Sequence, residues 1–260
     1  MSSSTSSLKV RDVNLLYPGV PVEQILLAEQ TSCLSVQAFL KMCGLNFEVE
    51  MRSNAEHMSP AAGKLPFIKC GQSIVAELEP IVEFVEKRGV SLTQHLNHEQ
   101  KSDMKAYMSL INVVLHHAEL YLNWIHEKTY REITKRRYSS CYPWPLNHVL
   151  TWKKRKAVIS KLKTYGWASN TVDEVRLTNS FFELINLPLH MVQAMIIMVG
   201  RRRQQLLLPT ELDALVFGHL FSILTTTLPD VNLSNVVRQF PNLVELCRRI
   251  DSAHFQKHSD

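Results

Sequence analysis

Between residues 20 and 60, the apolar positions change from short runs to a helical spacing and back. The apolar run at residues 25–28 predicts a strand, and the spacing of apolar positions over 32–43 predicts a helix that ends before Gly44. Residues 47–51 alternate apolar and polar side chains, as in a half-buried strand. We therefore expect a β-α-β unit, with parallel strands and a right-handed crossover.

A hairpin and a helix are predicted to follow. Residues 65–70 and 73–76 read as two strands around a Gly71-Gln72 turn. Pro66 cannot donate to a strand ladder, so it marks either a sheet edge or a cis turn. Pro80 suits the first position of a helix over 81–88.

The order β-α-β followed by β-β-α is typical of a thioredoxin-like domain, which we place at residues 21–90. The Ser-rich residues 1–20 are expected to be a flexible lead-in, and they show no secretory signal.

Residues 91–260 read as all-helical. Asn97 and Gln100 have the spacing of a capping box at the start of a long helix that reaches Ile125. A Pro- and aromatic-rich break at 141–146 precedes further helices, expected near 152–165 and 235–255.

A second capping box predicts the centre of the helical part. Thr210 and Asp213 precede a dense apolar run over 212–224, so this helix should be buried on nearly all sides. Such a helix resembles the folding signature of the C-terminal half of glutathione-transferase-like proteins. The expected fold class is thus α+β: a thioredoxin-like domain followed by an all-helical, glutathione-transferase-like domain.

The charge is unevenly distributed. The chain has 29 Lys and Arg against 24 Asp and Glu, yet residues 131–163 contain ten basic residues and one acid, Glu132. Such a stretch suits a membrane surface, an acidic protein face or nucleic acid, or it is simply a solvated helix face. No nucleic-acid-binding motif accompanies it, so we expect no nucleic-acid partner.

Five side chains of this stretch are candidate partner contacts: Trp144, Lys153, Lys154, Arg155 and Lys156. Trp144 lies between two prolines and could either anchor a partner or fill the core of its own domain.

Metal and redox chemistry find little support. The five Cys form no CxxC pair, which favours a reducing compartment over a disulfide scaffold. His95 and His98 have no companion ligand, and the adjacent His116 and His117 point to different sides of a helix. We expect no metal site and no cofactor.

Glutathione chemistry is the alternative function, with Cys33 or Ser32 near the start of the first helix as the candidate activators. Glutathione transferases commonly carry an acid followed by Ser before the third helix, and the hydroxyl holds the ligand's carboxylate. The corresponding residues are Glu77 and Leu78, and Leu cannot donate that hydrogen bond.

Several runs resemble the metaxin family over residues 24–175 and 208–255. The most specific are Tyr142-Pro-Trp-Pro-Leu-Asn-His148 and the Pro-Thr-Glu-Leu-Asp-Ala-Leu-Val-Phe-Gly-His-Leu run at 209–220. The resemblance implies a non-enzymatic subunit on the cytosolic face of the mitochondrial outer membrane. Its partners would be a membrane-anchored metaxin and the β-barrel assembly core. The polar C-terminal residues 252–260 agree with a peripheral association.

The resemblance is interrupted at residues 176–208. This atypical segment contains a mostly apolar run over 181–199 and an Arg triplet at 201–203. It could graze or span a membrane, or form a bundle helix broken at Pro188. The abrupt edges of the resemblance favour a third explanation, an alternatively spliced or normally non-coding stretch.

Overall fold

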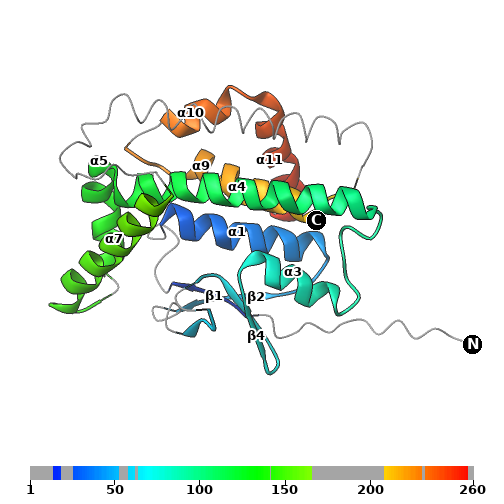
Figure 1. Ribbon diagram of the computed structural model, residues 1–260, viewed down its shortest axis with the longest axis horizontal. Coiled ribbons are helices and arrows are strands. Elements are labelled where there is room, and N and C mark those ends of the chain that lie inside the picture. Colours follow the sequence, from blue (N-terminus) through cyan, green and yellow to red (C-terminus); the bar gives the residue numbers. More distant parts are fainter. Residues whose placement is uncertain are drawn as a thin grey trace, which may run out of the picture.

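The computed structural model describes residues 14–18, 26–52, 58–61, 64–140, 142–165, 208–229 and 232–256. In these residues a small sheet is covered on one face by two helices, α1 and α3. The long helix α4 lies on the far side of α1 from the sheet (Figure 1).

The sheet has four strands in the order β2-β1-β3-β4. β1 pairs in parallel with β2, whereas β1–β3 and β3–β4 are antiparallel. The hairpin around Gly71 is therefore confirmed, and β2 has a parallel partner as predicted, although that partner is not the predicted strand at 25–28. The strand bounds are Asn14–Pro18 for β1, Glu48–Arg52 for β2, Phe67–Cys70 for β3 and Ser73–Ala76 for β4.

The first strand differs from the prediction. β1 lies at Asn14–Pro18, inside the segment expected to be a flexible lead-in, and residues 27 and 28 belong to α1 (Leu27–Met42). The strand prediction for 25–28 was wrong because four apolar residues fit a buried helical turn as well as a strand. Leu27 and Ala28 are indeed buried.

Glycine ends α1 as predicted. Gly44 has a φ of 67°. Its N–H donates to the Lys41 carbonyl, and the Leu45 N–H donates to the Leu40 carbonyl. This pair of hydrogen bonds is a Schellman motif, which turns the chain toward β2. Helix α3 spans Leu78–Glu86, so Pro80 is its third residue and not its first.

The helical half begins with α4 (His98–Trp124). The Asn97–Gln100 capping box is confirmed: the Gln100 N–H donates to Asn97 Oδ1 at 2.8 Å, and the Asn97 N–H donates to Gln100 Oε1 at 3.1 Å.

Beyond α4 the chain forms three short helical segments and then a longer, basic helix. Residues 142–145 separate α6 from α7, which begins earlier than predicted, at Leu146. The single helix expected over 235–255 is two helices because Pro241 starts a new one. The bounds are Glu127–Thr129 for α5, Tyr130–Thr134 for the π-helical turn η2, Lys135–Ser140 for α6, Leu146–Thr164 for α7, Asn232–Arg238 for α10 and Pro241–His254 for α11.

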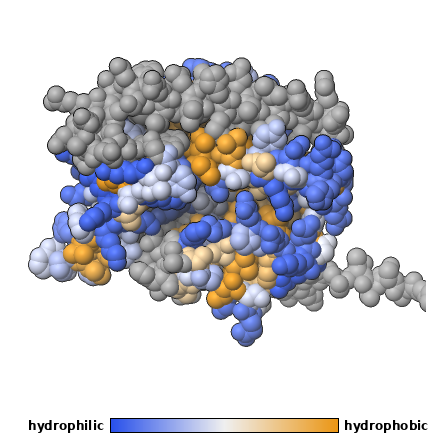
Figure 2. Space-filling model, viewed as in Figure 1, coloured by the Kyte–Doolittle hydropathy of each residue, from blue (hydrophilic) through white to orange (hydrophobic). Residues whose placement is uncertain are grey.

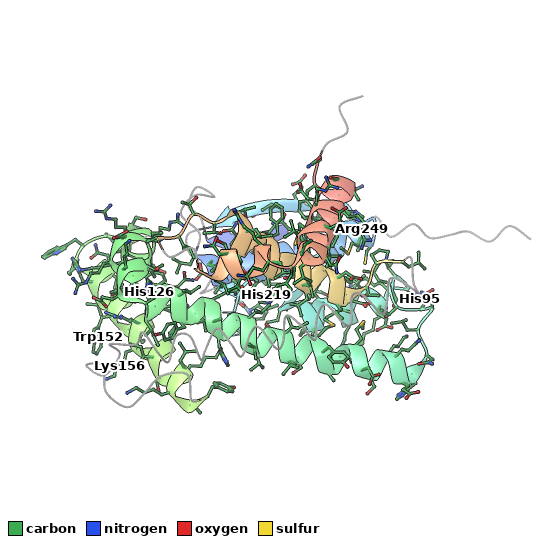
Figure 3. All side chains as sticks on the ribbon, turned by 90° about the horizontal axis from the view of Figure 1, so that it is seen from above. His95, His126, Trp152, Lys156, His219 and Arg249 are labelled. Atoms are coloured by element: carbon green, nitrogen blue, oxygen red, sulfur yellow. The ribbon has the colours of Figure 1, made fainter. Side chains whose placement is uncertain are left out.

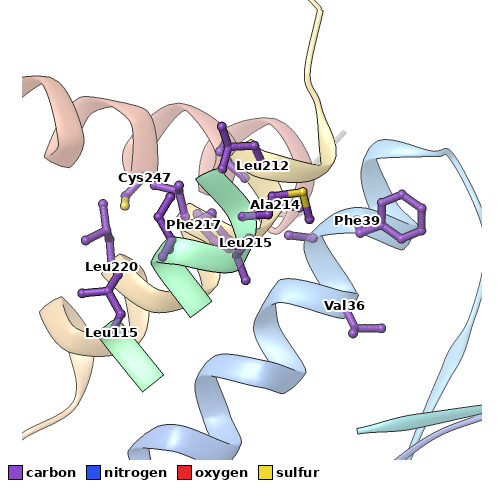
Figure 4. Close-up of a cluster of buried hydrophobic side chains, with 14 of the residues drawn as sticks. Val36, Phe39, Leu115, Leu212, Ala214, Leu215, Phe217, Leu220 and Cys247 are labelled. Carbon is purple, nitrogen blue, oxygen red and sulfur yellow. The ribbon is translucent and has the colours of Figure 1, made fainter. Parts of the chain in front are cut away.

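Helix α9 (Glu211–Thr225) is the buried hub that the sequence predicts. Its capping box is present, and the Thr210 N–H donates to Asp213 Oδ2 at 2.8 Å. Figure 4 shows Leu212, Leu215 and Phe217 of α9 among side chains from α1, α4 and α11. One apolar core therefore joins the sheet-covering helix α1 to the helical half.

The atypical segment lies outside the described residues except for Leu208, as does Cys141.

Candidate interaction surface

The side chains considered for thiol chemistry lie inside the α1 contacts. The Thr31 hydroxyl donates to Glu119 Oε1 at 3.0 Å, and the Ser35 hydroxyl donates to the Thr31 carbonyl at 3.0 Å. Cys33 is completely buried. Because α1 begins at Leu27, Cys33 is in its second turn, and the expectation that Cys33 stands at the helix start was wrong. The Ser32 hydroxyl donates to the Ala28 carbonyl.

Two other thiols are held in the protonated form. Burial, helped by the charge of Glu211, raises the pKa of Cys43 to about 12. Burial and then the charge of Asp251 raise the pKa of Cys247 to about 12. Since the thiolate is the nucleophile, neither thiol is reactive at neutral pH.

In the turn before α3, both the backbone N–H and the carboxylate of Glu77 are bonded to other residues of this chain. Glu77 has a φ of 70°, and its N–H donates to the Pro66 carbonyl at 3.1 Å. The Glu77 carboxylate pairs with Lys64 Nζ at 2.8 Å. Leu78 is the first residue of α3 and supplies no hydroxyl. The peptide bond before Pro66 is cis, one of the two alternatives that the sequence allowed.

The basic helix α7 packs on the C-terminal end of α4. Val158 and Leu162 of α7 join a buried cluster with Trp124 of α4 and Tyr130 of η2. Trp124 meets Tyr138 of α6 edge-on, with ring centroids 5.3 Å apart. These contacts bury one face of α7 and hold the helix in one orientation, so the opposite face points away from this cluster.

Arg155 belongs to this packed side. Its Nε donates to the Trp124 carbonyl at 3.1 Å, and its guanidinium pairs with Glu127 at 3.2 Å and lies 3.8 Å from the Tyr130 ring centroid. Arg155 was expected to be a partner contact, but its charge is used within the chain.

The other face of α7 and the turn before it expose large apolar side chains. The exposed fraction is 78% for Trp144, 45% for Leu146, 56% for Val149 and 63% for Trp152. With 3.6 residues per turn, Leu146 and Val149 lie opposite the buried Val158 and Leu162, and Trp152 lies on the flank between these two faces. Trp144 is therefore not a filler of its own core.

Lysines accompany these apolar side chains. Lys153 and Lys156 are exposed on the same side of α7, and Lys156 Nζ lies 5.2 Å from the Trp152 ring centroid. No Asp or Glu occurs between residues 133 and 165. We call this surface the α7 tip, and it consists of Trp144, Leu146, Val149, Trp152, Lys153 and Lys156. Trp152 and Lys156 lie at one end of the molecule, far from His95 (Figure 3).

Of the six tip residues, sequence reasoning identified Trp144, Lys153 and Lys156 and missed the other three. The signal was present, since Leu146, Val149, Lys153 and Lys156 recur at helical spacing. Lys154, a further candidate, is half-buried at the edge of the packed side.

No group of three or more His, Cys, Asp or Glu side chains within the described ranges could hold a metal ion. None of the helices in those ranges combines the length and apolar character needed to cross a bilayer.

Two family models match the chain. Residues 33–155 match a family described as outer mitochondrial membrane transport complex protein. Residues 207–250 match the C-terminal domain of glutathione S-transferases.

Solved structures place the fold among the glutathione transferases. Glutathione transferase GSTFuA3 from Phanerochaete chrysosporium aligns with a TM-score of 0.60 over 95% of this chain and 98% of its own, at 10% identity. Glutathione S-transferase III in its apo form gives 0.50 over 93% and 92%, also at 10% identity. At such low identity the likeness concerns the fold alone. The chain thus has a glutathione-transferase-like fold, with a thioredoxin-like sheet and a helical C-terminal half.

The sequence relatives are more specific. Metaxin-2 of Homo sapiens is 47% identical over 245 residues, which are 93% of this chain and 88% of that protein. The Metaxin-2 homolog of Caenorhabditis elegans is 37% identical over 82% of this chain and 89% of its own. Metaxin-1 of Mus musculus is 24% identical over 87% and 71%. The chain belongs to the metaxin family.

Proposed function

We propose that this chain is a non-enzymatic subunit of the mitochondrial outer-membrane sorting and assembly machinery, which imports and assembles β-barrel proteins. The observation that carries the proposal is the 47% identity with Metaxin-2 of Homo sapiens across 93% of the chain. The match of residues 33–155 to a family of outer-membrane transport complex proteins supports it.

The buried environment of α1 supports a non-enzymatic role. Glutathione transfer needs a hydroxyl or thiol that can reach the ligand, but Thr31 and Ser35 are bonded within the core and Cys33 is buried. Leu78 stands where a hydroxyl would hold the ligand's carboxylate. The competing function is a cytosolic glutathione-transferase-like thiol enzyme. Turnover of glutathione with a model electrophile, lost in Cys33→Ala or Ser32→Ala, would favour that enzyme.

The partners we propose are a membrane-anchored metaxin and the β-barrel assembly core, met from the cytosolic face by peripheral association. Metaxin-1 and Metaxin-3 proteins are relatives at 24–28% identity, so a related chain is a reasonable companion. The α7 tip is the part of the described surface that we assign to attachment at the membrane assembly, with Lys154 at its edge.

Affinity purification tests this proposal. The tagged full-length chain would be recovered from detergent-solubilised mitochondrial outer membranes, and the bound proteins would be identified. We expect a second metaxin and the barrel-forming core of the assembly machinery. Recovery of chaperones alone, with the tagged chain in the cytosol, would contradict the proposal.

A further inference from the structure

We propose that the α7 tip binds directly to an anionic lipid bilayer, with Trp144 and Trp152 at the level of the headgroups and Lys153 and Lys156 against lipid phosphates. This inference rests on the proposed function in one respect. The proposed function assigns the α7 tip to attachment at the membrane, and the inference names the lipid bilayer as what the tip contacts there.

The apolar side chains of the tip suit a bilayer interface. Four large apolar side chains that follow one another closely in sequence are 45–78% exposed, and two of them are tryptophans. The indole ring combines an apolar body with one N–H donor, and it concentrates at the boundary between lipid tails and water. Val149 and Leu146 can enter the same boundary layer beside the rings.

The charge of the tip suits anionic headgroups. Lys153 and Lys156 are exposed, as are Lys135 and Arg136 of the neighbouring helix α6. Because residues 133–165 contain no acid, no carboxylate of α6 or α7 weakens the attraction of these cations for lipid phosphates. Lysine stems are long enough for the ammonium groups to reach phosphates while the Trp rings stay in the interface.

The mixture of residues favours lipid over a protein partner. The centres of protein–protein interfaces are depleted of lysine. In the tip, by contrast, lysines intersperse with the apolar residues, and Lys156 Nζ lies over the Trp152 ring. Indole rings at the headgroup level with lysine ammonium groups beside them are typical of protein surfaces that meet a membrane interface.

The tip is also built in advance and lies at the outside of the molecule. Val158 and Leu162 pack around Trp124, and Arg155 ties α7 to the Trp124 carbonyl, so the opposite face points outward. In Figure 1, α7 projects beyond the sheet at one end of the molecule. Figure 2 shows apolar side chains over this projecting end, beside hydrophilic ones. Binding needs no rearrangement of the helix, which removes an ordering cost.

Vesicle flotation of the full-length chain tests the inference. The probes are vesicles of phosphatidylcholine alone and of phosphatidylcholine with phosphatidylserine. We expect the chain to float with the anionic vesicles only, and less so at high salt because the attraction is screened. A variant with W144S, W152S, K153Q and K156Q should bind at least thirtyfold more weakly, about the effect of the two lysines alone.

The matched control lies on another surface. Tyr107 and Leu110 are exposed apolar residues of α4, and Lys105 and Lys69 are exposed cations away from α7. A variant with Y107S, L110S, K105Q and K69Q makes the same kinds of change and should float like the unchanged chain. Circular dichroism shows whether both variants are folded.

Three results would overturn the inference: tip-variant binding equal to that of the unchanged chain, failure of the unchanged chain to float with anionic vesicles, or loss of protein partners by the tip variant in detergent. The last result would mean that a protein occupies the tip. The proposed function fails separately, if the unchanged chain recovers no second metaxin while it still binds anionic vesicles.

Discussion

Nδ1 of His219 in α9 lies 2.7 Å from Oε1 of Glu119 in α4, and both side chains are almost completely buried. The same oxygen accepts a hydrogen bond from the Thr31 hydroxyl of α1. In the described part of the chain, Oε2 of Glu119 makes no hydrogen bond. A buried carboxyl group that joins three helices therefore depends on two partners.

Replacement of His219 should lower stability strongly. His219→Ala leaves the Glu119 carboxyl buried with Thr31 as its remaining partner, and loss of a partner from a buried pair costs about 3 kcal/mol. Urea unfolding followed by circular dichroism measures the change. Glu132→Gln, at an exposed position of η2, should change the free energy of unfolding by less than about 0.5 kcal/mol. A His219→Ala cost below about 1 kcal/mol would show that the pair is not a stabilising contact.

Gly218 should not tolerate a side chain. A Cβ at this position would lie 2.0 Å from Ser35 Oγ, 2.6 Å from the Ser35 nitrogen and 2.8 Å from the Thr31 carbonyl oxygen. Gly218→Ala must separate α9 from α1 and should cost about 3 kcal/mol or more in unfolding free energy. Ser35→Ala in the same chain should not restore stability, because two of the clashing atoms are backbone.

Gly44→Ala is the comparison for that experiment. Gly44 has open space around it and a φ of 67°, so only the backbone conformation opposes a side chain. We expect a cost of about 1 kcal/mol. Equal costs at the two glycines would argue against close packing of α9 on α1.

Arg155 and Lys153 should differ in how much they contribute to the stability of the fold. Arg155→Ala removes the contacts to the Trp124 carbonyl, Glu127 and Tyr130 and should lower the unfolding free energy by about 1–2 kcal/mol. Lys153→Ala, on the opposite face, should leave the melting temperature unchanged. If both variants melt at the same temperature, Arg155 does not hold α7 in place.

Stability should fall in mild acid. Burial, and to a lesser extent the positive charges nearby, with Lys161 first, lower the pKa of His116 from 6.5 to about 3. The unfolded chain thus binds more protons between these two values, so stability is full above about pH 6.5 and decreases below it. At pH 5.5 the loss from this one group is about 1 kcal/mol. Burial also lowers the pKa of His117 and of His254, so the effect of these two groups on stability in acid has the same sign.

Thermal unfolding at pH 7.5 and pH 5.5 measures this effect. His116→Gln removes the titrating group and should reduce the difference between the two melting temperatures. A difference that His116→Gln leaves unaltered would assign the acid sensitivity to other groups.

Local chemistry made much of the fold predictable. The capping boxes at Asn97 and Thr210 and the glycine at residue 44 each set one helix end through contacts within a few residues, so a sequence pattern suffices to find them. The strand Asn14–Pro18 escaped prediction because its place depends on pairing with β2 and β3, which are distant in sequence.

The candidate surface was only partly predictable, for a related reason. Whether a cation on α7 faces solvent or a neighbour depends on what packs beneath it, and the carbonyl of Trp124, 31 residues away, holds Arg155. Helical spacing places Arg155 and Lys153 on different faces of α7, but it does not reveal which of the two faces is packed. The exposure of Trp144 likewise follows from the packing of α7 on α4, which composition does not reveal.

The contact between Gly218 and Ser35 also limits how this chain can be divided. The sheet-bearing half and the helical half follow each other in sequence. However, α1 and α9 pack so closely that the two halves share one apolar core. A fragment that ends at Gly89 would expose the apolar face of α1 to water and collect into aggregates. Binding measured with an isolated half would then reflect the apolar surface that the cut exposes. Partner sites are therefore better located by point substitutions in the whole chain.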